Sequence, residues 1–174
     1  MNEKLPSREQ SVNLLFENGC SPNVVRHCKA VADLAIELSK TLKKKGRNID
    51  VKLVEAGALL HDIGRSRTHT INHLIEGVRI AESAGLPNSV VLIIKRHVGG
   101  GVTPEEAAKL GWPKDDYVPG SLEEKIVCYA DKLIEGSNRV PIQVTIDQLS
   151  MLNNGAAERV KKLHEEITAL MDDP

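Results

Sequence analysis

The sequence has few aromatic residues and almost no net charge. Its 174 residues include one Phe, one Trp and two Tyr, and 23 basic residues stand against 24 acidic ones, for a formal net charge of -1. Proteins that bind single-stranded nucleic acids stack the bases on aromatic side chains. General nucleic-acid binders carry an excess of basic residues. We therefore expect no general nucleic-acid binding.

Cysteines and long apolar runs are also scarce. The three cysteines, Cys20, Cys28 and Cys128, form no CxxC pair, which argues against a disulfide framework or a cysteine-type zinc site and predicts buried free thiols. No apolar run approaches the ~20 residues of a membrane span, and the first residues do not resemble a secretory leader. These features predict a cytoplasmic protein without a membrane segment.

Helix signals are present along most of the chain. Hydrophobic residues make up 41% and charged residues 27%, as in soluble globular proteins, and the length fits one domain. Capping residues precede several segments with apolar positions three and four residues apart, a pattern typical of amphipathic helices. The only plausible strand is 140–146, which Pro141 weakens. We predict an all-α, single-domain protein.

One segment, 99–120, breaks the helical pattern. It opens with three consecutive glycines and contains three prolines. Thr103 and Glu106 form a capping box that predicts one short helix within it. Because long irregular segments inside compact domains are often functional, the segment is either a lid or wall of a site, or an excursion on the surface.

Histidines and aspartates fall beside apolar positions on five predicted helices. They are His27, His61, Asp62, His73, His97 and Asp131. Any one of them alone is explained as a core histidine, a helix cap or an ion-pair partner. Buried polar groups are costly unless they are paired, so six such side chains require a common cause. A divalent metal ion in the core of a helical bundle is the simplest one.

The chain resembles the HD-domain superfamily of metal-dependent phosphohydrolases. His61-Asp62-Ile63-Gly64 is an HDIG motif, preceded by the apolar segment VEAGALL. His27 lies upstream in VVRHCKAVADLA, and Ala130-Asp131-Lys132 lies downstream. The segments NHLIEGVRIAE and KRH are similar to those that supply extra ligands in two-metal subfamilies. Without a GYP triplet after KRH, the chain is more similar to small stand-alone HDIG proteins than to the HD-GYP branch.

The resemblance implies a ligand set and a domain organisation. It implies a first metal ion bound by His27, His61, Asp62 and Asp131, and a second bound by Asp62, His73 and His97. Mixed imidazole and carboxylate ligands suit one or two ions of iron, manganese, cobalt, nickel or zinc. It also implies a single HD domain over 1–174, with a core at about 22–136 and a C-terminal helical extension at 137–174.

Nearby cations and histidines are candidates for substrate contacts. Arg65 and Lys132, beside the HD motif and Asp131, are candidate phosphate contacts that would act in catalysis with Asp62. For Arg65 and Lys132 the alternative is a solvated charge or an ion pair. For Lys95 that alternative is the preferred interpretation. Arg67 and Arg96 also lie near the motifs. His69 is either a substrate or acid–base residue at the rim, or a surface histidine. His164 is expected to be solvated.

The function implied is hydrolysis of a phosphate ester or anhydride by metal-activated water. The expected partner is a small phosphorylated substrate, such as a nucleotide. Two alternatives remain at this point. One is a di-iron oxygenase with the HD fold, whose ligands overlap with those above. The other is a non-catalytic HD sensor or interaction module, against which the complete ligand set argues. Substrate, metal and oligomeric state stay open.

Overall fold

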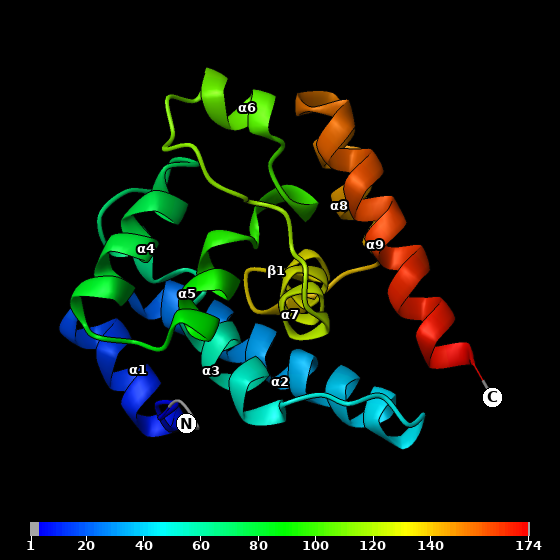
Figure 1. Ribbon diagram of the computed structural model, residues 1–174, viewed down its shortest axis with the longest axis horizontal. Helices are drawn as coiled ribbons and strands as arrows, with labels where there is room; N and C mark the ends of the chain where they lie inside the picture. Colours follow the sequence, from blue (N-terminus) through cyan, green and yellow to red (C-terminus); the bar gives the residue numbers. More distant parts are fainter. Residues whose placement is uncertain (1–3, 174) are drawn as a thin grey trace.

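Helices form almost all of the regular secondary structure in this computed structural model, which describes residues 4–173 (Figure 1). This confirms the all-α prediction. Between α7 and α8, two short strands form an antiparallel pair in which Ile134 is opposite Arg139. The elements in order are α1 (Arg8–Glu17), α2 (Pro22–Lys44), α3 (Val51–Leu60), the 3-10 helix η1 (Ile63–Ser66), α4 (His73–Ser83), α5 (Asn88–Lys95), the 3-10 helix η2 (Val98–Gly100), α6 (Pro104–Lys109), α7 (Leu122–Lys132), β1 (Ile134–Glu135), β2 (Asn138–Arg139), α8 (Ile142–Leu152) and α9 (Asn154–Asp172).

Local capping explains where several helices begin. The side chain of the N-cap residue accepts a hydrogen bond from the backbone N–H three residues later in α1, α2, α3, α6 and α7. Thr103 and Glu106 form the complete capping box expected at α6. Such caps satisfy backbone donors that the first turn leaves unpaired, so the helix starts follow directly from the local sequence.

The strand predicted over 140–146 is wrong. Val140 still donates a backbone hydrogen bond to Leu133 at the end of the β1–β2 hairpin. Pro141 has no N–H to continue that ladder, and α8 begins at Ile142. The apolar residues of this segment therefore follow a helical period and pack α8 against α9.

The core surrounds α2 and α3 in two clusters of buried apolar side chains. One joins α2, α3, α5, α7 and α9, and the other joins α1, α4 and α5 to the other side of α2 and α3. Fully buried members include Leu42, Leu59, Ile94 and Ile126. This packing brings the ends of α3, α5 and α7 together at the centre of the molecule. Among residues 4–173, no helix combines the length and apolar character that crossing a membrane requires.

The segment 99–120 packs on α4. Trp112 and Tyr117 form a small apolar cluster with Leu74, and Trp112 Nε1 donates a hydrogen bond to Asn72 Oδ1 at 2.8 Å. An isolated bridge between Val102 and Tyr117 closes the excursion on itself. The segment therefore supports the helix that begins at His73.

Gly64 allows η1 and α4 to approach closely. A Cβ at Gly64 would lie 1.7 Å from the backbone oxygen of His73 and 2.5 Å from the nitrogen of Gly77. A Cβ at Gly77 would in turn lie 3.4 Å from the backbone nitrogen of Gly64. Gly64→Ala is therefore expected to lower the free energy of unfolding by about 3 kcal/mol, because backbone atoms must separate. Urea denaturation measures this loss.

Gly120→Ala is the matched control for Gly64→Ala. Its φ is not positive, and the nearest atom to an added Cβ is Arg96 Nη1 at 3.5 Å, an ordinary contact. The control is expected to change stability by less than about 0.5 kcal/mol. Equal effects of the two substitutions would contradict the close-approach argument.

Candidate metal centre

The six predicted ligands meet at the centre of the fold, and helix ends position them. His27 lies in the second turn of α2, His61 follows the last residue of α3, and Asp62 precedes η1. His73 begins α4, His97 follows α5 by two residues, and Asp131 lies one residue before the end of α7. His61, Asp62, His73 and His97 are buried, whereas the side chains of His27 and Asp131 are 17% and 16% exposed. The exposed pair marks the solvent side of the centre.

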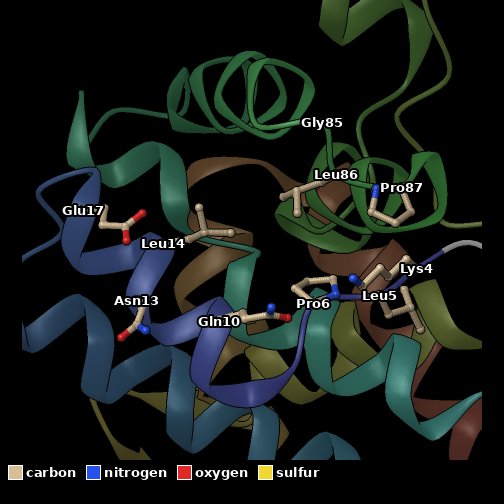
Figure 2. A pocket seen from close by; sticks show the side chains of 10 residues that line it. All are labelled: Lys4, Leu5, Pro6, Gln10, Asn13, Leu14, Glu17, Gly85, Leu86 and Pro87. Atoms are coloured by element: carbon tan, nitrogen blue, oxygen red, sulfur yellow. The ribbon is translucent and has the colours of Figure 1, made fainter.

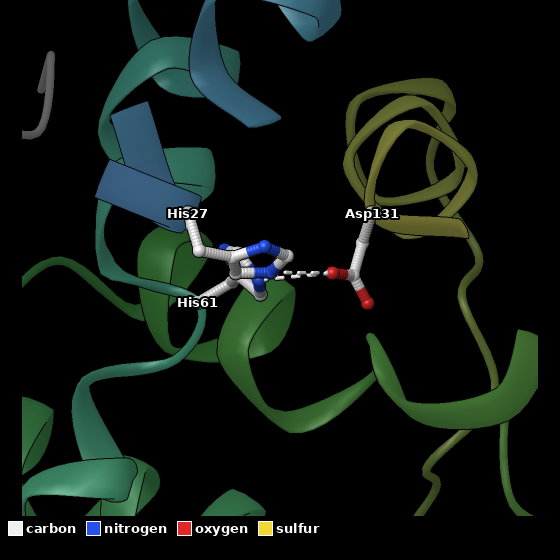
Figure 3. A group of neighbouring side chains, drawn as sticks. All are labelled: His27, His61 and Asp131. Carbon is white, nitrogen blue, oxygen red and sulfur yellow. Dashed lines mark hydrogen bonds and ion pairs between the residues drawn. The ribbon is translucent and has the colours of Figure 1, made fainter. Parts of the chain in front are cut away.

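His27, His61 and Asp131 form the first group. The Nε2 atoms of His27 and His61 lie 3.0 and 3.3 Å from Asp131 Oδ1. Figure 3 shows the two imidazole rings facing the carboxylate from α2 and from the end of α3. All three ligand atoms lie within 4.8 Å of one another, a spacing that could hold a metal ion.

Asp62 connects this first group to a second one. Its Oδ1 lies 3.2 Å from His73 Nε2 and 3.3 Å from His97 Nε2. Its Oδ2 lies 3.6 Å from the Nε2 atoms of both His27 and His61. His61, Asp62 and His97 also have ligand atoms within 4.8 Å of one another. One carboxylate therefore reaches both groups.

All four imidazoles are oriented by their Nδ1 atoms. Each Nδ1 lies 2.6–2.8 Å from a backbone carbonyl oxygen, which can only accept a hydrogen bond. The carbonyls belong to Gly136 for His27, Ala58 for His61, Thr70 for His73 and Ile94 for His97. The Nδ1 atoms are therefore donors, and in a neutral ring the Nε2 lone pair points toward the centre.

This donor set fits a divalent transition metal. The inward groups are carboxylate oxygens and imidazole Nε2 atoms, and the two Nε2 atoms of His73 and His97 face each other at 3.2 Å. Within residues 4–173, the buried Nε2 of His61 has no hydrogen-bond partner. Imidazole nitrogens and carboxylate oxygens that face one another as acceptors are stabilised by a cation between them. Imidazole together with carboxylate is the ligand set of iron, manganese, cobalt, nickel and zinc. The centre thus contains histidine and aspartate groups able to bind a metal ion.

Burial and neighbouring charges shift the pKa values of the side chains in the centre. Burial alone would raise the pKa of Asp62, but neighbouring imidazoles hold it well below its usual range. Burial likewise favours a neutral Asp131, yet Lys132 and His61 lower the pKa of that carboxyl. Burial opposes a charge on His61, and the two carboxylates nevertheless raise its pKa. Burial lowers the pKa of His97 to about 4. Both aspartates are therefore anionic near neutral pH, and His97 is neutral.

Arg65 and Lys132 flank the centre in different ways. Arg65 Nε lies 3.0 Å from Asp62 Oδ2, and its Nη1 donates to the carbonyl of His69 at 3.2 Å. Lys132 is buried, and its Nζ lies 2.7 Å from Asp131 Oδ2 and 2.9 Å from the carbonyl oxygen of His97. Lys132 thus links one residue of each group, whereas Arg65 faces solvent.

The centre opens to solvent through a cleft of about 490 Å³. Its lining residues are Ser21, Asn23, Val24, His27, Asp62, Arg65, His69 and Gly136. Within the described chain, neither Lys132 nor any residue of 99–120 lines this cleft. The contacts of 99–120 with α4 agree with a surface excursion rather than with a lid or wall.

A separate cavity of about 380 Å³ lies away from the centre. Figure 2 shows it between the N-terminal segment with α1 and the start of α5. It is lined by Lys4, Leu5, Pro6, Gln10, Asn13, Leu14, Glu17, Gly85, Leu86 and Pro87. This set contains no histidine and a single carboxylate, so its side chains do not resemble those of the metal centre.

Several other side chains have partners outside the cleft. Lys95 pairs with Asp115 at 2.6 Å, as the ion-pair interpretation predicts. Arg96 pairs with Glu124 at 3.0 Å and does not line the cleft. The three cysteines are buried free thiols, as predicted.

Two partnerships join residues far apart in the sequence. His164 is not solvated as expected, because its Nδ1 lies 2.7 Å from the hydroxyl of Tyr129 in a partly buried contact. The role of Gly136 in orienting His27 was not predicted. No local signal reveals it, because 109 residues separate the two.

The comparisons with known proteins agree with this architecture. The family model of the HD domain matches residues 24–136. An uncharacterized protein of Methanocaldococcus jannaschii is 46% identical, and the alignment covers 94% of this chain and 98% of the length of that protein. The tRNA (cytidine(56)-2'-O)-methyltransferase of Thermoplasma volcanium is 39% identical over 96% of this chain. Ribonuclease Y of Aquifex aeolicus is 30% identical over 80% of this chain. The chain matches 48% of the methyltransferase and 22% of the ribonuclease.

A solved structure shares the fold. The HD domain of the Listeria monocytogenes phosphodiesterase PgpH, in complex with cyclic-di-AMP, superimposes with a TM-score of 0.57. The alignment covers 92% of this chain and 94% of that one at 15% sequence identity. The match of the HD-domain family model over residues 24–136 shows that the chain belongs to the HD-domain superfamily of metal-dependent phosphohydrolases, whose fold the solved structure shares.

Proposed function

We propose that this protein hydrolyses a phosphodiester bond of a nucleotide in the cleft above the metal centre. The observation that carries the proposal is the convergence of four Nε2 atoms and two carboxylates, with Asp62 reaching both groups. The names of two similar proteins, a ribonuclease and a phosphodiesterase, support a phosphodiester. The cyclic-di-AMP bound to the latter supports a nucleotide.

Each of the two groups of side chains would hold one metal ion. His27, His61 and Asp131 would hold one ion, and His73 and His97 would hold the second, with one oxygen of Asp62 directed at each. A bound divalent ion would lower the pKa of a water molecule and offset charge on the phosphoryl group. The Nδ1 hydrogen bonds to backbone carbonyls keep the four imidazoles in this orientation without side-chain rearrangement.

The two nearby cations would have different tasks. Arg65 lines the cleft, and among the described residues its Nη2 has no hydrogen-bond partner, so it can donate to a phosphate oxygen. Lys132 is committed to Asp131 and to the carbonyl of His97. We therefore assign Lys132 to positioning these two residues rather than to contacting phosphate.

We retain a single HD domain over 1–174, with its core at about 22–136 and 137–174 as an extension.

Hydrolysis is expected under nitrogen with manganese as the only added metal. Manganese(II) activates water without a redox step, so a linear dinucleotide such as pApA should be cleaved without dioxygen and not after chelation. Chromatography of the products measures the reaction. His61→Ala protein purified in parallel controls for contaminating nucleases.

Two outcomes would contradict this proposal. Turnover that strictly requires dioxygen and reduced iron would assign the protein to the di-iron oxygenases. Binding of pApA without turnover, under every divalent metal added, would favour a non-catalytic HD module.

A further inference from the structure

His69 lies at the cleft but outside the ligand set. It lines the cleft together with His27, Asp62 and Arg65, and its side chain is exposed. It belongs to the short segment between η1 and α4, four residues before His73. An imidazole in this place is close to the metal centre and open to solvent.

The backbone that carries His69 is held on both sides by residues of the centre. Before it, the guanidinium of Arg65 contacts Asp62 Oδ2 with Nε and donates to the carbonyl of His69 with Nη1. After it, the carbonyl of Thr70 accepts a hydrogen bond from His73 Nδ1 at 2.8 Å. The hydroxyls of Thr68 and Thr70, 3.0 Å apart, close the segment on itself. These contacts hold the backbone at His69 in place relative to Asp62.

The other titratable groups of the cleft are engaged. Both ring nitrogens of His27 have partners, and both oxygens of Asp62 face imidazoles or Arg65. Arg65 carries a guanidinium, a group that donates hydrogen bonds in proteins rather than giving up a proton. Across residues 4–173, the ring of His69 has no hydrogen bond, ion pair or ring contact. Of the groups that face the cleft, His69 is therefore the one that is free to give a proton to a substrate.

Hydrolysis of a nucleotide diester requires such a proton. The leaving oxygen of a nucleoside is a strong base, and a positioned acid lowers the barrier to its departure. We propose that His69 is the general acid that protonates the leaving oxygen. This inference rests on the proposed function. Asp62, Arg65 and His27 are the charged or titratable groups that face His69 across the cleft.

The proposed hydrolysis forms one bond at phosphorus and breaks another. The oxygen of water forms a bond to phosphorus, and the bond from phosphorus to the leaving oxygen breaks with its electron pair on that oxygen. The leaving oxygen takes the proton of His69, so the products are a phosphomonoester and an alcohol. The water loses a proton to the solvent. The exposed imidazole regains one from the solvent, which its position at the rim allows.

Two substrates with different leaving groups test this assignment. p-Nitrophenolate is a weak base that leaves without a proton, whereas a nucleoside alkoxide does not. His69→Ala is therefore expected to lower kcat on pApA about 10²-fold or more, with less than about 3-fold change on bis(p-nitrophenyl) phosphate. Added imidazole should restore part of the activity on pApA. Ile71→Ala, in the same segment with a 41% exposed side chain, is the matched control and should leave both activities unchanged.

The outcomes separate the two proposals. Equal losses on both substrates, or no loss on pApA, would overturn the role of His69 and leave the proposed function standing. Wild-type protein that cleaves neither substrate with manganese would overturn the proposed function, and the role of His69 with it.

Discussion

Asp62→Asn is expected to abolish hydrolysis and to remove most of the bound metal. The two oxygens of Asp62 face different groups, Oδ1 toward His73 and His97 and Oδ2 toward His27 and His61. A neutral amide cannot replace a carboxylate that bridges two cations. We expect kcat/KM to fall at least 10³-fold, or about 4 kcal/mol. Elemental analysis measures metal content alongside product chromatography.

Substitutions at single groups and at the surface give the controls for Asp62→Asn. His73→Ala removes a proposed ligand of the second group only and should lower bound metal by about one equivalent. Asp147→Asn makes the same change of side chain on the exposed surface of α8 and should alter neither metal content nor activity. Circular dichroism reports whether the helices are retained. Asp62→Asn protein with full metal content and activity would contradict the bridging assignment.

Lys132→Met is expected to destabilise the protein by about 3 kcal/mol, because it leaves Oδ2 of the largely buried Asp131 carboxylate without its ammonium partner. The Lys132 ammonium is buried between Asp131 Oδ2 and the carbonyl of His97. Methionine has similar volume but cannot satisfy either oxygen. Denaturant unfolding of chelator-treated protein measures the loss without contributions from bound metal.

A second lysine and a double variant test this interpretation. Lys125 pairs with Glu166 at 2.7 Å, with both side chains partly exposed, so Lys125→Met should cost less than about 1 kcal/mol. Lys132→Met combined with Asp131→Asn removes both charges and should recover part of the stability. Losses of the same size for Lys132→Met and Lys125→Met would contradict a buried ion pair at Asp131.

Local features of the sequence predicted the helices and the composition of the centre. Caps such as Ser21 and Asp50 act within three residues, so they are visible without the fold. The apolar faces predicted that His27, His61, His73, His97 and Asp131 point inward, and the HDIG motif indicated the family. Three of the carbonyls that orient imidazoles lie three residues before their histidines, so they too depend on short-range helical geometry.

Only the tertiary structure decided the contacts that join distant segments. Gly136 orients His27 across 109 residues, and Lys132 turns toward His97 rather than toward the cleft. The packing of 99–120 on α4 likewise depends on what that segment meets. The physical reason is that capping and periodicity act over one or two helical turns. The direction of a long side chain, or of a loop, is set by partners that only the packed chain supplies.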